Sequence, residues 1–526
     1  MTFRFRHNTP TETIRSMPLS RFALIMSVVN LILYNIPFFR FVATHSALSP
    51  LRQTFLIGSL VIAMVALNFL ACYLMLFLFR SVGKVIVALT HVLNATCLYF
   101  VVVYNVIIDG SMLGNVFNTR YSEASGFFSP WLFITVIVIG ILPAIYVLWQ
   151  KVDYGTWKRF GASSGIAIGT SLLLVALNFN QLLWVGEWDT ELGGLLMPWS
   201  YTVNTGRLIA QHRQENEKEI LLPDGTFTDE QKTAVVLVIG ESARKANFSL
   251  YGYERETNPL LAQRSDIHCL MARSCATYTT AGVRSMLEYK AQSTLYEILP
   301  NYLYRMGADV VWRSNNWGEP PVHIDEYETK SQLAKRYPDA DSRYDGILME
   351  GLKQRIEQSE KNKVFIVLHT TTSHGPSYNA YYPEEFNRFT PICENVEEGR
   401  RQLDRLINTY DNSIVYTDYL LNNLIDTLQT LTEWHTAMLF VSDHGESLGE
   451  NSLFMHGMPI NIAPKEQYEI PFIVWTSIGF RQMKEQTKEI EQHAVYHSVL
   501  NLMSLKSDIY DPEKDIFLPL DTSLTD

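Results

Sequence analysis

Five long apolar segments near the start of the chain constrain its fold more than any other feature. None contains a charged residue, and they cover Phe22–Phe39, Thr54–Phe79, Val85–Ile108, Pro130–Gln150 and Phe160–Val185. Each is about long enough to cross ~30 Å of hydrocarbon at ~1.5 Å per residue. No small-x-small cleavage site follows the first segment, which argues against a signal peptide. The sequence therefore predicts a bundle of five transmembrane helices.

Basic residues concentrate on one side of these predicted spans. The N-terminal arm and the second and fourth connections carry most of them, namely Arg4, Arg6, Arg15, Arg21, Arg80, Lys84, Lys151, Lys158 and Arg159. Positive charge favours the cytoplasmic side, so we expect a cytoplasmic N-terminus. Five crossings then deliver everything after Val185 to the opposite side, the periplasm of a Gram-negative cell, and make this a multi-pass protein of the bacterial inner membrane.

The remainder of the chain divides into a connecting segment and a long second domain. Trp188–Thr205 is rich in aromatic residues, as is typical of a membrane interface, and Gln211–Lys232 is polar like a linker. We expect a transmembrane domain over residues 1–186, an interfacial helix and linker over 187–232, and an exported domain over 233–526. A net charge of −11 without any basic tract argues against nucleic-acid binding.

Short apolar runs alternate with helical patterns in the exported half. The predicted strands are Ala234–Ile239, Val310–Trp312, Val364–Leu368, Ala437–Val441 and Pro471–Trp475, and the clearest predicted helix is Gln402–Leu431. This alternation predicts an α/β sandwich with a mostly parallel sheet. A domain of this size needs no disulfide framework, although a Cys269–Cys275 bond stays open.

Potential metal ligands follow three of these strands. Glu241 comes after the first, His374 after the third, and Asp443-His444 after the fourth, with His456 nearby. Parallel strands bring such ends to one edge of a sheet, and carboxylates and imidazoles are ligands that zinc accepts. A single carboxylate can be a helix cap and a single histidine an ordinary loop residue, but together they favour one or two zinc ions.

A cluster of hydroxyl side chains provides a candidate nucleophile. The stretch Ser274–Gly282 contains Thr277, Thr279 and Thr280. Metal coordination lowers the pKa of a bound hydroxyl and so can activate a threonine. From composition alone, however, a threonine-rich strand or cap is the simpler interpretation.

Several short motifs, in this order along the chain, resemble those of bacterial phosphoethanolamine–lipid A transferases of the polymyxin-resistance type, in the alkaline phosphatase-like superfamily. The membrane half has Asn115-Val116-(x)2-Thr119-(x)3-Glu123. The exported half has Gly240-Glu241-Ser242-Ala243-Arg244, Ser274-Cys275-Ala276-Thr277-Tyr278-Thr279, Ser373-His374-Gly375-Pro376, Tyr410-Asp411-Asn412, Ser442-Asp443-His444-Gly445-Glu446, His456-Gly457 and Ala463-Pro464-Lys465-Glu466-Gln467.

The resemblance implies a role for each matching residue. Thr279 is then the nucleophile that becomes phosphoethanolaminylated, with Glu241, Asp443 and His444 around the same principal zinc. His374 and His456 bind a second zinc or steady the acceptor and the leaving group. The residues implied in substrate binding are Asn115, Thr119 and Glu123 for the donor headgroup and Asn316 for phosphoethanolamine.

Three departures from the family pattern concern disulfides and substrate contacts. Ser285 stands where relatives commonly have the cysteine that pairs with Cys275, and Cys393 lacks a nearby partner. Pro320 stands where some relatives have a substrate-binding lysine. These changes affect stabilisation and acceptor preference rather than the expected metal ligands.

The resemblance implies a zinc-dependent, two-step transfer of phosphoethanolamine from phosphatidylethanolamine to a lipid A phosphate, with release of diacylglycerol. The added ammonium group lowers the negative charge of the cell surface and so weakens attraction of cationic peptides. We expect a monomer that works on membrane lipids. The alternatives are a membrane-anchored phosphodiesterase or sulfatase of the same superfamily, transfer to another glycan or to a protein, and a non-catalytic scaffold.

Overall fold

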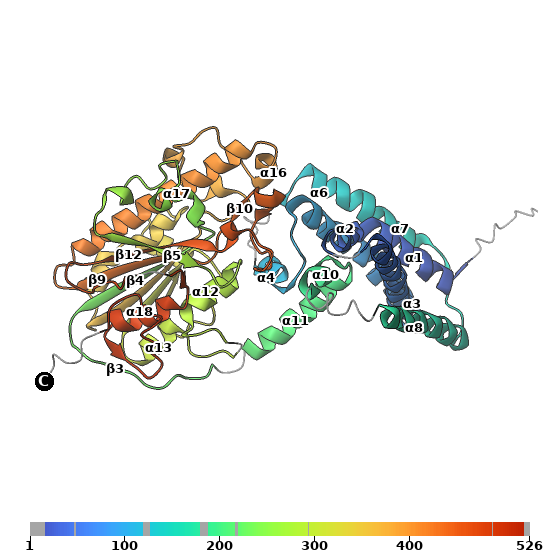
Figure 1. Cartoon of the computed structure of the whole chain (residues 1–526), viewed down its shortest axis with the longest axis horizontal. Helices are drawn as coiled ribbons and strands as arrows, with labels where there is room; N and C mark the ends of the chain where they lie inside the picture. Colours follow the sequence, from blue (N-terminus) through green and yellow to red (C-terminus); the bar gives the residue numbers. More distant parts are fainter. Residues whose placement is uncertain are drawn as a thin grey trace, which may run out of the picture. The chain divides into compact units, whose positions relative to one another are not determined.

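The chain forms two compact units. The computed structural model describes residues 16–46, 49–118, 127–178, 188–215, 219–292, 294–485 and 488–519 (Figure 1). One unit comprises Met1–Leu113 with Phe128–Gly206, and the other comprises Gly114–Phe127 with Arg207–Asp526. Each has its own cluster of buried apolar side chains.

The first unit is almost entirely helical. Met17–Pro18 (β1) and Val152–Asp153 (β2) form its two-stranded sheet. Its α-helices, two of which extend past its borders, are α1 (Leu19–Tyr34), α2 (Ile36–His45), α3 (Pro50–Tyr104), α4 (Gly110–Asn118), α6 (Pro130–Thr135), α7 (Leu142–Trp149), α8 (Trp157–Leu177), α10 (Asp189–Leu195) and α11 (Trp199–Glu215). A π-helical stretch, Val136–Ile141, joins α6 to α7.

Helix α3 folds back on itself at Arg80. As a straight rod its 55 residues would extend ~80 Å, far more than the ~30 Å of a bilayer core. Arg80 leaves the helical region with φ 45° and ψ −111°. A Cβ atom on Gly83 would lie 2.5 Å from the carbonyl oxygen of Met75, whereas residues eight apart in a continuous helix are ~12 Å apart. Residues 50–79 and 81–104 therefore form two arms.

Helices α1 and α2 are one broken helix, bent by 61° at Asn35. Pro37 contributes to the break, because a proline at the second helical position has no N–H to continue the preceding helix. The Asn35 side chain compensates for lost backbone bonds. Its amide donates to the Met197 carbonyl at 3.0 Å and its Oδ1 accepts from the Met197 N–H at 2.9 Å. The break is thus fixed by the segment between α10 and α11.

The apolar helices agree with a membrane domain, although the structure does not by itself confirm five spans. Three described helices, Pro50–Tyr104, Pro130–Trp149 and Trp157–Leu177, are long and apolar enough to cross, and the bent α1–α2 pair makes four. The second predicted span lies within α3, and the third begins in α3 and extends past its end at Tyr104. The last predicted span extends beyond α8 into residues 179–187, outside the described part of the chain.

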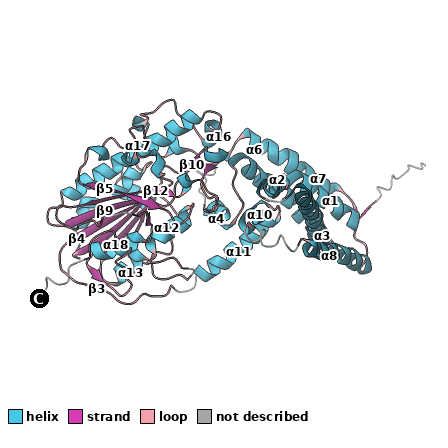
Figure 2. Ribbon diagram, viewed as in Figure 1, coloured by secondary structure: helices cyan, strands magenta, loops and turns pink. Residues whose placement is uncertain are grey.

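The second unit is built on a mixed eight-stranded sheet (Figure 2). Its order is β13-β5-β12-β9-β4-β8-β6-β7. The strands are β4 (Thr233–Gly240), β5 (Ile267–Arg273), β6 (Asp309–Ser314), β7 (Glu326–Thr329), β8 (Lys363–His369), β9 (His435–Ser442), β12 (Glu469–Thr476) and β13 (Ile490–Glu491). Smaller two-stranded sheets pair β3 (Thr226–Phe227) with β14 (Leu505–Lys506), and β10 (Ser447–Leu448) with β11 (Phe454–Met455).

All five predicted strands are present, each within two residues of the expected ends. The neighbouring strands β9, β4, β8 and β6 are parallel, as the apolar runs indicate for strands buried on both faces. Strand β12 instead runs antiparallel to both β9 and β5. The sequence did not reveal β5, because its exposed His268 and Cys269 interrupt any apolar run.

Helices cover both faces of this sheet. On one face lie α12 (Thr279–Leu287), α13 (Leu299–Arg305) and α18 (Ala494–Leu502), which share a core with Val235, Leu237 and Ile239 of β4. The other face carries α17 (Leu403–Gln429), close to the predicted helix (Figure 2). Peripheral helices α14 (Lys330–Arg336), α15 (Leu352–Glu357) and α16 (Val396–Gly399) complete the unit.

All five cysteines are free thiols. The Cys269–Cys275 bond that the sequence left open is therefore not formed. Cys269 lies within β5 and faces outward, whereas Cys275 lies beyond the end of this strand. The hydrophobic core of the unit is large enough to stabilise it without such a cross-link.

Candidate metal and phosphoryl-transfer site

The ends of three neighbouring parallel strands bring the predicted residues together. Strand β4 pairs with β8 on one side and β9 on the other, and Gly240 lies opposite Ser442. Glu241 follows β4 and Asp443-His444 follow β9, so both motifs emerge at the same edge of the sheet. All three side chains are fully buried or nearly so.

Glu241, Asp443 and His444 form a compact acceptor cluster around one point. His444 Nε2 lies 3.3 Å from Asp443 Oδ2 and 3.5 Å from Glu241 Oε1. Ligand atoms of all three lie within 4.8 Å of one another. The Thr279 hydroxyl oxygen joins them, 3.3 Å from His444 Nε2 and 3.4 Å from Glu241 Oε2.

The protonation pattern of this cluster fits a divalent cation. His444 Nδ1 lies 2.8 Å from the Gly445 carbonyl, which can only accept, so this nitrogen carries the proton. The Nε2 lone pair therefore points at two carboxylates. Asp443 Oδ2 is buried and accepts no hydrogen bond from the described residues. Three converging buried acceptors repel one another unless a cation lies between them, so a metal ion fits this donor set.

Burial shifts the pKa values of these ligands in the expected directions. It raises the pKa of the Asp443 carboxyl to about 6, against the opposing effect of hydrogen bonds from the Ser242 and His444 N–H groups. Burial also lowers the pKa of His444 to about 4, and nearby His456 adds to the shift. His444 is thus neutral at physiological pH, the form in which imidazole binds metals.

Thr279 occupies the first turn of α12 and is 1 % exposed. The N-terminal end of a helix carries partial positive charge, which favours an anionic oxygen or a phosphoryl group there. Gly282, one turn along, permits a close approach: a Cβ at this position would lie 2.2 Å from the Asp443 carbonyl oxygen. The helix backbone therefore packs directly on the Asp443-His444 turn.

Glu241 is held in place by two side chains. Ser242 Oγ donates to its Oε1 at 2.7 Å, and Asn316 Nδ2 donates to its Oε2 at 2.7 Å. Asn316 also reaches the Thr370 carbonyl, which links the turns after β6 and β8. Ser242 has φ 53°, a left-handed conformation that is strained for a non-glycine residue and is frequent at functional sites.

The Asp443-His444-Gly445 turn packs against the segment Ala463–Gln467. A Cβ on Gly445 would lie 2.0 Å from the Glu466 carbonyl oxygen, so only glycine fits. The N–H groups of Gly445 and Glu446 donate to the carbonyls of Gln467 and Glu466, each at 2.9 Å. Two motifs that are separate in the sequence thus form one rigid unit.

His374 and His456 lie beside the acceptor cluster. The ring centroid of His456 is 4.2 Å from that of His444 and 6.0 Å from that of His374. His456 Nδ1 is 3.3 Å from Glu446 Oε2, a carboxyl whose pKa burial raises to about 8. Among the residues that the structure describes, the compact group of potential metal ligands does not include His374 or His456.

The structure adds positioning residues that had no signal in the sequence. Gln492 Nε2 donates to the carbonyls of Ser442 and Asp443 at 2.9 and 2.7 Å. Asp345 Oδ2 accepts the N–H groups of Thr371 and Thr372, in the loop that leads to His374. Both act through contacts between segments far apart in the chain, which no local pattern predicts.

The proposed donor-binding residues lie largely outside the described structure. Thr119 and Glu123 fall in residues 119–126, which are not described, and Asn115 lies in α4 without a described side chain.

Ser285 donates to the Ala281 carbonyl at 2.8 Å within α12. The position of the missing cysteine is thus occupied by a residue that bonds within its own helix.

Two family models match the chain. The model described as Sulfatase matches residues 233–505, and the model described as Phosphoethanolamine transferase EptA/EptB matches residues 63–213. The two matches together cover most of the membrane unit and most of the unit that contains the acceptor cluster.

Characterised proteins resemble the chain along nearly its whole length. Phosphoethanolamine transferase EptA of Helicobacter pylori is 35 % identical over 510 residues, 94 % of this chain and 95 % of that protein. Phosphatidylethanolamine transferase Mcr-1 of Escherichia coli is 31 % identical and covers 82 % of this chain and 85 % of its own. Lipooligosaccharide phosphoethanolamine transferase A of Neisseria meningitidis has a solved structure that matches with a TM-score of 0.83, 25 % identity and coverage of 96 % and 99 %.

Proposed function

Because the chain belongs to the phosphoethanolamine–lipid A transferase family, in the alkaline phosphatase superfamily, we propose that it carries phosphoethanolamine on Thr279 between two lipids. The donor is phosphatidylethanolamine and the acceptor is a phosphate of lipid A. The observation that carries this proposal is the position of the Thr279 oxygen, 3.3 and 3.4 Å from two members of the acceptor cluster.

In the first step, Thr279 attacks the phosphorus of the donor. Its hydroxyl lies 3.4 Å from Glu241 Oε2, which can accept the proton, while the lone pair of His444 Nε2 is left for the metal. A new bond forms between Thr279 Oγ and phosphorus, and the bond from phosphorus to the diacylglycerol oxygen breaks. In the second step a lipid A phosphate oxygen forms a bond to the same phosphorus, and the bond from phosphorus to Thr279 Oγ breaks, which regenerates Thr279.

The cofactor is zinc, held by Glu241, Asp443 and His444. Three protein ligands of mixed nitrogen and oxygen type, with a fourth position left for the reacting group, are the pattern of catalytic zinc sites. When bound, the ion would lower the pKa of the Thr279 hydroxyl and stabilise negative charge on the phosphoryl oxygens. Asn316 and Ser242 fix the orientation of Glu241 and so preset one side of this site.

His374 and His456 handle the leaving and entering groups. Burial lowers the pKa of His456 to about 4, so this imidazole is neutral before substrate binds. An anionic phosphodiester beside His456 raises its pKa, since a nearby opposite charge favours the imidazolium. The protonated ring can then donate to the departing diacylglycerol oxygen.

The membrane unit anchors the enzyme next to both substrates. We propose five crossings with a cytoplasmic N-terminus, domains over residues 1–186, 187–232 and 233–526, and a periplasmic catalytic domain. The reversal of α3 at Arg80 supports this count, because it divides one long helix into two arms of spanning length. Asn115, Thr119 and Glu123 would then lie on the catalytic side, where the donor headgroup is.

Substitution of Thr279 tests the proposal directly. Lipid A from cells with the Thr279→Ala variant should lack the phosphoethanolamine mass increment, whereas Thr279→Ser, which retains a hydroxyl, should keep part of it. In purified enzyme given donor but no acceptor, the tryptic peptide 274–284 should gain the same increment. An unmodified peptide during turnover, or full modification of lipid A by Thr279→Ala, would refute the proposed intermediate.

A hydrolase of the same superfamily is the second candidate. The Sulfatase match over residues 233–505 is compatible with it. Purified enzyme with fluorescent phosphatidylethanolamine and lipid A distinguishes the two reactions. A transferase yields diacylglycerol and modified lipid A, whereas a hydrolase yields free phosphoethanolamine without modified lipid A.

A further inference from the structure

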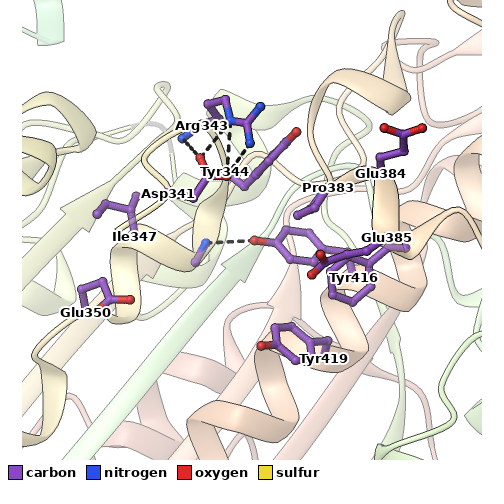
Figure 3. A pocket seen from close by; sticks show the side chains of 12 residues that line it. Asp341, Arg343, Tyr344, Ile347, Glu350, Pro383, Glu384, Glu385, Tyr416 and Tyr419 are labelled. Atoms are coloured by element: carbon purple, nitrogen blue, oxygen red, sulfur yellow. Dashed lines mark hydrogen bonds and ion pairs between the residues drawn. The ribbon is translucent and has the colours of Figure 1, made fainter. Parts of the chain in front are cut away.

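A second cavity, separate from the acceptor cluster, opens on the unit that carries the sheet. It has a volume of about 460 Å³, within the range of roughly 300–1,000 Å³ that is usual for small-molecule sites (Figure 3). Its lining contains none of the residues discussed above as metal ligands or nucleophile. We call it the tyrosine cavity, after Tyr344, Tyr416 and Tyr419, which line it together with Phe386.

The aromatic wall of the tyrosine cavity is preformed. The ring centroid of Phe386 lies 4.8 Å from that of Tyr416 and 5.1 Å from that of Tyr419. Tyr416 is only 4 % exposed, and its hydroxyl accepts the Gly346 N–H at 3.2 Å. Tyr419, one turn along α17, is 40 % exposed. A fixed inner ring and an accessible outer ring thus line the same wall.

The remaining polar residues of the cavity leave it strongly negative. The lining includes four carboxylates, Asp341, Glu350, Glu384 and Glu385, and one guanidinium, that of Arg343, which gives a net charge of −3. Arg343 is already paired with Asp341 at 2.7 Å. The three glutamates are exposed and form no ion pair with residues that the structure describes.

The cavity already attracts one organic cation from its own chain. The Arg343 guanidinium carbon lies 5.1 Å from the Tyr344 ring centroid, within the distance for a cation–π interaction. Aromatic faces beside unpaired carboxylates attract cations through both the ring quadrupole and direct charge. From these observations we infer that the tyrosine cavity is a binding site for an alkylammonium group, of the type carried by polyamines and by lysine-like side chains.

Two other kinds of ligand fit the tyrosine cavity less well. A metal ion needs converging ligand atoms, and among the described residues only Glu241, Asp443 and His444 bring three oxygen or nitrogen ligand atoms close together. A phosphoethanolamine headgroup carries a phosphate next to its ammonium, and the net negative lining repels that phosphate. The lining therefore favours an amine without an adjacent phosphate.

Fluorine NMR of the full chain can detect binding at this site. With 3-fluorotyrosine at position 419, n-butylammonium should produce a saturable shift of the fluorine signal, whereas neutral 1-butanol should not. O-phosphoethanolamine should bind more weakly than n-butylammonium. If it binds equally or more tightly, the site recognises a phosphate-bearing headgroup and the preference for a simple amine is wrong.

Variants of the lining separate this site from nonspecific attraction. The exposed pair Glu384→Gln/Glu385→Gln should weaken n-butylammonium binding about fivefold, since two nearby charges are lost. Phe386→Leu should weaken it about two- to fivefold by removing one ring while keeping an apolar side chain. Glu433→Gln, which removes an exposed charge outside the cavity, should leave the affinity unchanged. The inference fails if no saturable shift occurs in the millimolar range, if 1-butanol shifts the signal equally, or if the Glu384/Glu385 variant binds as well as the wild type.

Discussion

Gly282 is the position where the smallest change should have a large effect on catalysis. It lies in α12, one turn after the proposed nucleophile Thr279. An added Cβ would meet the Asp443 carbonyl oxygen at 2.2 Å and the Asp443 carbonyl carbon at 2.8 Å. Both are backbone atoms of the Asp443-His444 turn, so no side-chain rotation can relieve the contact.

The displacement caused by Gly282→Ala follows from these distances. A close carbon–oxygen contact in proteins is about 3.3 Å, so α12 and the Asp443 turn must separate by roughly 1 Å. Alanine favours a helix by about 1 kcal/mol over glycine, while the forced separation costs about 1–3 kcal/mol. Stability should therefore change by no more than about 2 kcal/mol. Activity should fall about 100-fold, because a misplacement of this size disrupts the alignment of nucleophile and phosphorus.

The assay compares initial rates of phosphoethanolamine transfer by detergent-purified full-length variants. Gly206→Ala is the matched control, because Gly206 is also helical and an added Cβ there meets no atom within 4 Å. The control should transfer at the wild-type rate. Thermal unfolding midpoints of both variants identify any general loss of structure.

Near wild-type activity of Gly282→Ala would refute this reasoning. It would mean that the contact between α12 and the Asp443 turn relaxes freely and does not position Thr279. A loss of activity accompanied by complete unfolding would instead contradict the estimated stability change, because packing at this helix would then matter more than the local geometry of the site.

Three further predictions concern the metal, a buried carboxyl and the thiols. Asn316→Ala should weaken zinc binding about 10- to 100-fold, as measured by competition with a fluorescent chelator, because Glu241 loses a hydrogen bond that orients it; unchanged affinity would exclude this role. Burial raises the pKa of Asp418 from 3.8 to about 7, so the folded protein holds a proton that the unfolded chain loses between about pH 4 and 7. The stability of the wild type therefore declines by up to about 1.4 kcal/mol per pH unit as pH rises through this window, whereas Asp418→Asn has no such proton to lose. The unfolding midpoint of Asp418→Asn relative to that of the wild type should increase between about pH 5 and pH 8. A constant difference between the two midpoints would contradict the shifted pKa. Dithiothreitol should leave the unfolding midpoint unchanged, because all five cysteines are free; a decrease would reveal a disulfide.

The sequence predicts most of the exported fold because its central strands are continuous apolar runs. Ala234–Ile239 and Ala437–Val441 are buried on both faces, and such runs leave little choice of secondary structure. The direction of a strand does not follow from its apolar character. Pro471–Trp475 has the same apolar character as its parallel neighbours, yet β12 is antiparallel, because direction depends on the connection rather than on the strand itself.

Some residues of the candidate site could be predicted from the sequence and others could not. The chemically distinctive residues Glu241, Asp443 and His444 follow predicted strands, and parallel pairing explains why they meet. Thr279 lies in a cluster of hydroxyl residues, but only the resemblance identified it as the nucleophile, since composition alone favours a threonine-rich strand or cap. Gln492 could not be predicted at all, because its amide serves backbone carbonyls some 50 residues away in sequence. Such contacts appear only when the chain has folded.

Because the protein has no disulfides, a bound metal ion would also stabilise the fold. With all five thiols free, no sulfur bridge ties the β4 end to the β9 turn, although Glu241 and His444 are about 200 residues apart in the chain. An ion shared by these segments would add a cross-link to the hydrogen bonds that already join them, and at about 1,000 times its Kd it would add about 4 kcal/mol to stability. Under the zinc dependence proposed above, scarcity of the ion would therefore shorten the lifetime of the enzyme as well as stop its turnover, by leaving the metal-free domain open to proteases.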